Sequence, residues 1–236
     1  MNSQTMQTLL LSGLPYAAIV LFIAGMIWRY RSRYTISSLS SQILESRWLV
    51  WGSVPFHLGI AILFIGHLIP VLMPDAWQAL VSRRAVLLTV ETIGLGAAIL
   101  CLIGLVVFLI RRISVSSVRR SSTFVDIVVL LVLISQVGLG IGVATMHRWG
   151  SVWSASTTTP YLWSLVTLRP DPTAVAGIPL LLALHLAGAW IVLALIPFTR
   201  LVHLFTFPFE YLGRPPQKVV WSKPRPELEE RIDAGV

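Results

Sequence analysis

Long apolar stretches separated by short polar segments dominate the pattern of hydrophobic and polar positions. A helix needs about 20 mainly apolar residues to cross a bilayer. Five stretches reach that length, at about residues 9–28, 49–73, 85–110, 124–146 and 178–205. The first has neither a preceding basic region nor an obvious cleavage site, so we interpret it as a retained helix. The pattern predicts an all-α integral membrane bundle of five transmembrane helices.

Composition supports the membrane interpretation. Of the 236 residues, 56% are hydrophobic and 12% are charged, whereas soluble domains average about 25% charged residues. The net charge of +8 could indicate nucleic-acid binding, but the arginines cluster between apolar stretches, where they orient a membrane protein. The single cysteine, Cys101, lies in an apolar stretch. This excludes a cysteine-ligated iron–sulfur cluster, a disulfide framework and a C-x-x-C-H haem attachment.

Arginine and lysine are distributed unequally between the two sides of the predicted bundle. Thirteen lie in the connections after the first and third helices and in the C-terminal segment, and four lie in the other connections. Because positively charged loops stay in the cytoplasm, the N-terminus is predicted outside and the C-terminus inside. Inverted insertion, the alternative, would carry thirteen positive charges across the membrane. We expect a membrane domain over residues 1–206 and a cytoplasmic tail over residues 207–236.

Four of the five histidines lie in apolar stretches, two in the second helix and two in the fifth. They are His57, His67, His185 and His203. Ionisable residues inside membrane helices are rare and often functional, and neutral imidazole is a strong ligand of haem iron. The four histidines therefore predict bis-imidazole ligation of two b-type haems. The alternative is four buried histidines whose nitrogens bond to backbone carbonyls.

Helix direction determines which histidines pair. The second helix runs outward and the fifth inward, so His57 pairs with His203 near the cytoplasm, and His67 with His185 near the outer face. Eighteen residues separate His185 from His203, about 27 Å and five full turns of one α-helix. The ten residues from His57 to His67 cover only about 15 Å. Tilted helices or a kink at Pro197 would have to absorb the difference.

Short motifs along nearly the whole chain resemble those of a known family. They are Arg29-Tyr30, Tyr34-Thr35, residues 40–45, Phe56-His57-Leu58-Gly59, Gly66-His67, residues 101–104, Arg111-Arg112, His185-Leu186, residues 197–203, Pro208 and residues 210–212. The sequence resembles the gamma subunit of respiratory nitrate reductase, a five-helix di-haem cytochrome b with the same ligand spacings.

The resemblance implies a function. His57 and His203 would hold the inner, proximal haem, and His67 and His185 the outer, distal haem. The chain would be a quinol dehydrogenase subunit that oxidises menaquinol or ubiquinol at the outer face and releases protons there. Electrons would pass through the haems to a cytoplasmic iron–sulfur beta subunit and a molybdenum alpha subunit that reduces nitrate. The location would be a bacterial or archaeal plasma membrane, with the tail contacting the partners.

Candidate quinol-binding residues lie beside the outer haem. The family has a lysine before the third helix, where this sequence has Arg83 and Arg84. Arginine supplies a charge near a quinone oxygen but cannot act as a base. Gly66 precedes His67 and would let a quinone or haem edge approach closely. The alternatives are arginines that bind lipid headgroups and a glycine that serves helix packing.

Two further arginines are candidate partners of haem propionates. Arg200 lies three residues before His203 on the same helical face, and Arg112 lies at the cytoplasmic end of the third helix. Guanidinium groups bind carboxylates bidentately, and lipid phosphate is the alternative partner.

Other features of the outer half suggest supporting roles. Gly138, Gly140 and Gly142 would admit the face of the outer haem or let helices approach. Residues 148–177 carry three tryptophans, which favour the membrane interface. We therefore expect this loop to lie across the outer surface.

Three other functions stay open from the sequence. The same subunit could serve a nitrite-oxidising complex that runs in reverse, which haem redox potentials would distinguish. It could be the haem anchor of another molybdenum enzyme, or of a sulfur-compound or heterodisulfide reductase, which co-purifying subunits would reveal. It could also be a transporter or an anchor without haem, which a visible spectrum would test.

Overall fold

The computed structural model describes residues 9–32 and 47–205. The chain divides into two compact units, residues 1–202 and residues 203–236, and each is described by itself. In the second unit, the description covers only residues 203–205, at the end of a 3₁₀ turn. The predicted cytoplasmic tail, residues 207–236, lies outside the described residues.

Every regular element in the described ranges is helical. The long helices are α2 (Leu14–Arg31), α3 (Arg47–Leu72), α5 (Arg84–Ser114), α7 (Phe124–Met146) and α10 (Leu180–Leu195). The shorter elements are η1 (Leu9–Gly13), α4 (Pro74–Val81), α6 (Ser116–Arg120), α8 (Gly150–Trp153), α9 (Thr158–Val166), η4 (Pro172–Val175), η5 (Ile196–Phe198) and η6 (Arg200–Leu204). Five helical segments in this part of the chain are long and apolar enough to cross a membrane. The predicted fold class and number of membrane helices are confirmed.

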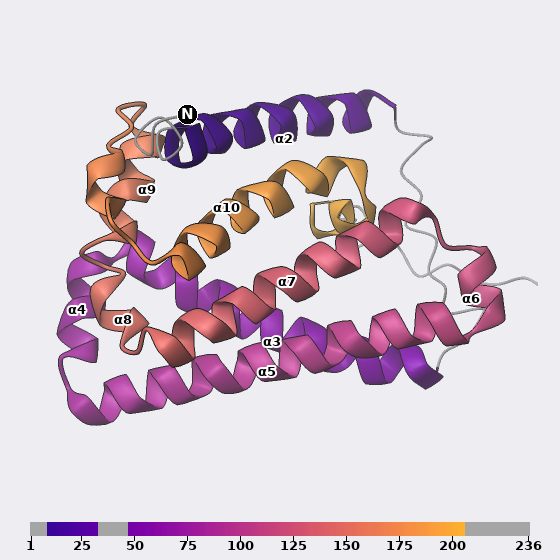
Figure 1. Ribbon diagram of the computed structural model, residues 1–236, viewed down its shortest axis with the longest axis horizontal. Helices are drawn as coiled ribbons and strands as arrows, with labels where there is room; N and C mark the ends of the chain where they lie inside the picture. Colours follow the sequence, from indigo (N-terminus) through magenta and orange to yellow (C-terminus); the bar gives the residue numbers. More distant parts are fainter. Residues whose placement is uncertain (1–8, 33–46, 206–236) are drawn as a thin grey trace, which may run out of the picture. The chain divides into compact units, whose positions relative to one another are not determined.

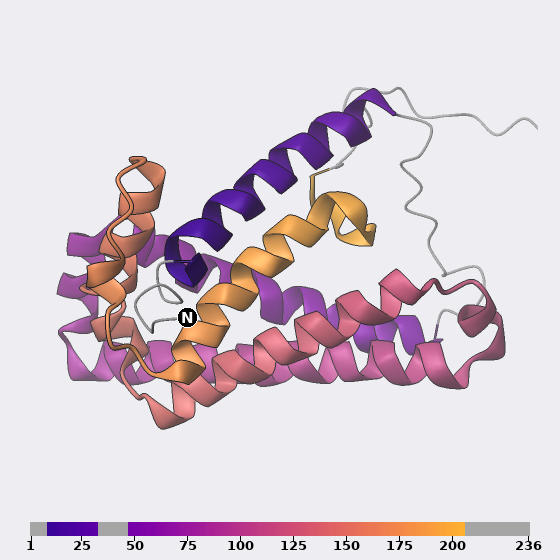
Figure 2. The ribbon, with the colours of Figure 1, turned by 45° about the horizontal axis from the view of Figure 1, so that its top comes forward.

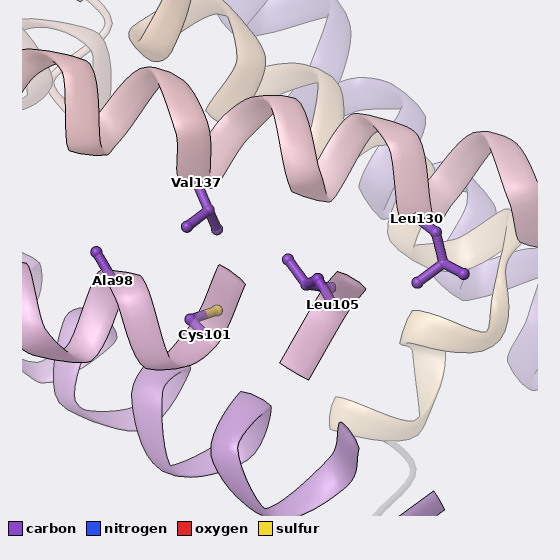
Figure 3. Close-up of a cluster of buried hydrophobic side chains, with 5 residues drawn as sticks. All are labelled: Ala98, Cys101, Leu105, Leu130 and Val137. Atoms are coloured by element: carbon purple, nitrogen blue, oxygen red, sulfur yellow. The ribbon is translucent and has the colours of Figure 1, made fainter. Parts of the chain in front are cut away.

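The long helices of the first unit pack in the succession α3, α5, α7, α10 and α2. In both ribbon views α10 lies between α2 and α7 (Figure 1 and Figure 2). A cluster of buried side chains from α5 and α7 forms the core between these two helices (Figure 3). Its members are Ala98, Cys101, Leu105, Leu130 and Val137. Small residues also bring α3 against α5, because a Cβ at Gly59 would lie 2.6 Å from Ala97 O.

The start of α7 follows a clear sequence signal. The Asp126 N–H donates to Thr123 Oγ1, and the Thr123 N–H donates to the Asp126 carboxylate. This reciprocal capping box satisfies two backbone donors that the first helical turn leaves without partners. It explains why the helix begins at the predicted residue, Phe124.

The fifth membrane helix is shorter than predicted. The helix α10 ends at Leu195, and the 3₁₀ turns η5 and η6 follow, separated by an extended Thr199. Pro197 has no N–H to donate and disrupts the helix. The prediction that His185 and His203 lie on one face of a continuous helix is therefore wrong. The break occurs at Pro197, where the sequence allowed for a kink.

Two residues of α2 support this break. Arg29 Nε donates to Pro197 O at 2.6 Å, which gives the broken helix the hydrogen-bond partner that backbone groups need within a membrane. A Cβ at Gly25 would lie 2.6 Å from Pro197 Cβ, so the missing side chain allows α2 to approach the break closely. The first membrane helix therefore holds the C-terminal end of the last one.

The connection between α7 and α10 covers one end of the first unit, which we call the α4 end because α4 also lies there (Figure 1). Tyr161 Oη donates to Leu11 O at 2.7 Å and Trp163 Nε1 donates to Val71 O at 2.9 Å. Val71 lies at the C-terminal end of α3, where backbone carbonyls lack partners within the helix, and Leu11 lies in η1 at the start of the first membrane segment. The loop lies across the ends of the helices at the α4 end (Figure 1), and its location on the outer surface stays a prediction. We call the opposite end, which carries α6, the α6 end.

Candidate functional site

The structure places the imidazole rings of His67 of α3 and His185 of α10 next to each other. Their ring centroids are 6.4 Å apart and their planes are inclined at 48°. An imidazole nitrogen lies about 2 Å from a metal that it binds, so two imidazoles on opposite sides of one iron have centroids roughly 6 Å apart. The pair therefore has the spacing that a shared iron requires.

Hydrogen bonds set the tautomer of both rings. His67 Nδ1 donates to Leu63 O at 2.7 Å, and His185 Nδ1 donates to Gln136 O at 3.1 Å. A carbonyl oxygen only accepts hydrogen bonds, so each Nδ1 carries the proton and each Nε2 is the unprotonated nitrogen. Metal-binding histidines commonly have this arrangement, with the second ring nitrogen bonded to a carbonyl. The alternative of histidines satisfied by carbonyls accounts for Nδ1 and leaves the closeness of the two rings unexplained.

His57 has the same kind of support, on α3. Its Nδ1 lies 2.8 Å from Ser53 O and 3.1 Å from Ser53 Oγ, and Phe56 packs edge-on against its ring. His203 is exposed in η6 and is the first residue of the second unit. The pairing of His57 with His203 stays a prediction.

The glycines of α7 have different surroundings. A Cβ at Gly140 would lie 2.9 Å from His185 Cε1, and a Cβ at Gly142 would lie 3.0 Å from Leu181 Cδ2. A Cβ at Gly138 would have nothing within 4 Å. Gly140 therefore makes room for the ring of a predicted ligand, and Gly142 lets α7 and α10 approach.

Gln136 is a residue that the sequence reasoning missed. Its side-chain Nε2 donates to the backbone carbonyl of His185 at 3.0 Å, while its backbone carbonyl accepts from the His185 ring. It is the one glutamine in a mainly apolar membrane stretch, and a polar residue in such a stretch is a signal of function.

The predicted quinol-site residues lie at the α4 end. Arg83 is the N-cap of α5 and Arg84 is its first residue, and both side chains are exposed. Gly66 is exposed beside His67, and a Cβ added there would meet open space to at least 4 Å. These positions are compatible with access to the face of the histidine pair. Binding of quinol by these residues stays a prediction.

At the α6 end, the two arginines predicted to bind propionates share one carboxylate. Arg112 Nη1 lies 2.8 Å from Asp126 Oδ2, and Arg200 Nε lies 2.9 Å from Asp126 Oδ1. The Asp126 side chain is only 8% exposed. The sequence reasoning missed Asp126, although an acidic residue in an apolar stretch is a recognisable signal. Propionate binding by either arginine stays a prediction.

Glu91 is a second missed acidic residue within a membrane helix. Its Oε1 accepts from the Ser151 N–H at 2.9 Å, next to Trp149, whose φ of 67° is unusual for a residue with a side chain. It lines a cleft of about 270 Å³ between α5 and α7. The other lining residues are Leu88, Thr92, Leu95, Ala144, Thr145, Arg148 and Trp149. Since no predicted haem ligand lines this cleft, we interpret Glu91 as the anchor of α8 on α5.

The described donor set suits a cofactor that needs few protein ligands. No group of three or more histidine, cysteine, aspartate or glutamate side chains gathers in the described ranges. Haem iron needs only axial ligands from the protein, so a pair such as His67 and His185 suffices. The residues present fit a bis-imidazole haem at this position.

Five helices in the described ranges that are long and apolar enough to cross a membrane define the class as a multi-pass helical membrane protein. The family model of the nitrate reductase gamma subunit matches residues 7–222. The chain belongs to this family.

Several curated proteins are similar to this chain over most of their length. The nitrate reductase gamma chain of Bacillus subtilis (strain 168) is 32% identical over 205 residues, covering 85% of this chain and 92% of that protein. The respiratory nitrate reductase 2 gamma chain of Escherichia coli (strain K12) is 34% identical over 208 residues, covering 85% of this chain and 90% of the relative. The respiratory nitrate reductase 1 gamma chain of the same organism is 32% identical over 214 residues, covering 87% and 93%.

Proposed function

We propose that this chain is the quinol-oxidising membrane subunit of a respiratory nitrate reductase. The observation that carries the proposal is the adjacent pair His67 and His185, at 6.4 Å with each Nδ1 bonded to a backbone carbonyl. Membership of the nitrate reductase gamma subunit family supports the terminal reaction. Nitrate chemistry would belong to a partner subunit.

The four membrane histidines would hold two b-type haems. His67 and His185 would hold one haem, and His57 and His203 would hold the other. When bound, the haems supply one-electron redox chemistry at two depths in the membrane. The chain's own contribution is to present each Nε2 unprotonated, through the Nδ1 hydrogen bonds described above.

Quinol would bind at the α4 end, beside His67 and His185. Its oxidation to quinone releases two electrons and two protons. Arg83 and Arg84 would orient a quinol oxygen through charge-assisted hydrogen bonds, and Gly66 would let the ring approach His67. Because arginine keeps its proton, the two protons would leave to water at this end and not to these side chains.

The charge distribution supports an orientation for the chain. We propose that the α4 end faces the outside and the α6 end faces the cytoplasm, where Arg112 and Arg200 would lie near the propionates of the inner haem. Iron–sulfur and molybdenum subunits would bind on the cytoplasmic side, with residues 207–236 contributing to that contact. A C-terminal reporter enzyme should be active only in the cytoplasm, and activity outside would overturn this orientation.

Haem quantification in the purified complex tests the proposal. A pyridine haemochrome assay should give two haem b per chain for the wild type and one for His67→Ala or His57→Ala, with different spectral components lost. His147→Ala is the matched control, because His147 lies after the end of α7, outside the membrane stretches, and should retain both. One haem or none in the intact wild type would refute the proposal, and loss of the same component in both variants would refute the pairing.

A further inference from the structure

His185 is held differently from His57 and His67. His57 and His67 each bond to a carbonyl four residues earlier in their own helix, Ser53 O and Leu63 O. His185 of α10 bonds instead across to Gln136 O of α7. The orientation of this one ring therefore depends on how two helices are joined.

Gln136 and His185 exchange two hydrogen bonds between α7 and α10. The backbone carbonyl of Gln136 accepts from His185 Nδ1 at 3.1 Å, and its side-chain Nε2 donates to His185 O at 3.0 Å. One glutamine thus contacts both the ring and the backbone of the same histidine. Two such bonds fix the rotation of α10 relative to α7 more tightly than one bond would.

Two glycines make this arrangement sterically possible. A Cβ at Gly140 would lie 2.9 Å from His185 Cε1, and a Cβ at Gly188 would overlap Gln136 Oε1. Gln136 Oε1 is buried and has no hydrogen-bond partner among the described residues. A buried acceptor without a partner is unfavourable, and the Nε2 bond to His185 O is the contact that compensates for it.

We propose that Gln136 is a positioning residue that sets the orientation of the His185 ring, and with it the angle between the two imidazole planes at the His67–His185 site. The inference rests on the proposed function, since the ring angle matters only if the pair binds haem. The plane-to-plane angle of two axial imidazoles determines the g anisotropy of a low-spin ferric haem. Gln136 therefore affects a spectroscopic property of one haem without contacting that haem.

Gln136→Met is the direct test, because methionine keeps the length and approximate volume of glutamine but cannot donate to His185 O. The Nδ1 acceptor, a backbone carbonyl, stays in place. We expect both haems to be retained in the purified complex, with the electron paramagnetic resonance signal of the His67–His185 haem shifted and the other signal unchanged. Ser135→Ala, on the exposed side of the same helix, is the matched control and should shift neither signal.

Gly188→Ala tests the same contact between α7 and α10 with Gln136 present. Its methyl group should displace the amide and shift the same signal. The double variant Gly188→Ala/Gln136→Ala should shift no further than Gln136→Ala alone, because removing the amide removes the overlap. Such non-additivity is expected for residues in direct contact, and it would not arise from general loosening of the helix pair.

The outcomes separate the two proposals. A wild type without two haems refutes the proposed function. A wild type with two haems whose His67–His185 signal is unchanged in both Gln136→Met and Gly188→Ala refutes the positioning role alone. If Gln136→Met lost all haem through misfolding, Gly188→Ala and the double variant would decide, and additive shifts there would also refute it.

Discussion

The two ends of the first unit are held together by different kinds of interaction. At the α4 end, neutral donors such as Tyr161 and Trp163 bond to backbone carbonyls of other helices. At the α6 end, Asp126 joins Arg112 and Arg200 through ion pairs. Neutral hydrogen bonds are insensitive to ionic strength, whereas partly exposed ion pairs are screened by salt. Ionic strength should therefore affect the α6 end more than the α4 end.

The largest effect should come from Gly140→Ala, toward the α4 end. The added methyl group would meet the His185 ring and displace a predicted ligand. Disturbing the support of a metal ligand typically costs 10–100-fold in affinity, so we expect loss of the His67–His185 haem in a haemochrome assay. Gly138→Ala, where the methyl group meets open space, should retain both haems. Equal haem content in the two variants would contradict the role assigned to Gly140.

Asp126→Asn should have the next largest effect, confined to the α6 end. Breaking a buried pair costs on the order of 3 kcal/mol because unpaired charge is left behind; Arg200, 45% exposed, would contribute little of this. Thermal unfolding in detergent should show a lower melting temperature. High salt should destabilise the wild type more than the variant. Asp75→Asn, at an exposed carboxylate of α4, is the control. An equal fall in melting temperature in that variant would contradict the stabilising role assigned to the Asp126 ion pairs.

Arg84→Ala and Arg83→Ala should weaken quinol oxidation while leaving haem content intact. Loss of a charge-assisted hydrogen bond costs about 1.5–3 kcal/mol, or roughly tenfold to a hundredfold in kcat/KM for quinol. We expect Arg84 to contribute more because it begins α5. Arg169→Ala, an exposed arginine of the same end, should leave the kinetics unchanged. Unchanged kinetics in the single and double variants of Arg83 and Arg84 would place the quinol site elsewhere.

The smallest effect should come from Tyr161→Phe, which removes the hydroxyl that donates to Leu11 O at the α4 end. The expected loss is about 1 kcal/mol in the free energy of unfolding, with no change in salt dependence. Burial raises the pKa of Tyr161 to about 12, above its unfolded value of about 10. The neutral tyrosine therefore stabilises the fold below pH 10, and this contribution is lost as pH rises to 12. Unfolding measured across that range should be flatter in the variant; parallel pH profiles would contradict this.

Much of the architecture follows from apolar periodicity alone. The ends of α3 and α7 lie within two residues of their predicted positions, because each is marked by a change from apolar to polar residues or by a capping box. The fifth helix was predicted too long, since hydropathy continues past Pro197 although the helix does not. Hydropathy reports burial in lipid and not backbone geometry.

The candidate site was predicted in part for the same reason. His67 and His185 are recognisable as ionisable residues in apolar stretches; the structure brings their ring centroids to 6.4 Å, and haem binding by the pair stays a prediction. Gln136 and Asp126 carried a similar signal and were missed, because their partners lie on other helices. A single sequence records which residues are polar but not which helices bring them together.

The hydrogen bond from Arg29 to Pro197 has a consequence for biogenesis. Its donor and acceptor are 168 residues apart, in the first and last membrane helices. Chains are synthesised from the N-terminus, so the donor is already in place when the broken helix emerges. We therefore expect the first membrane helix to supply this hydrogen-bond donor as the last one packs against it.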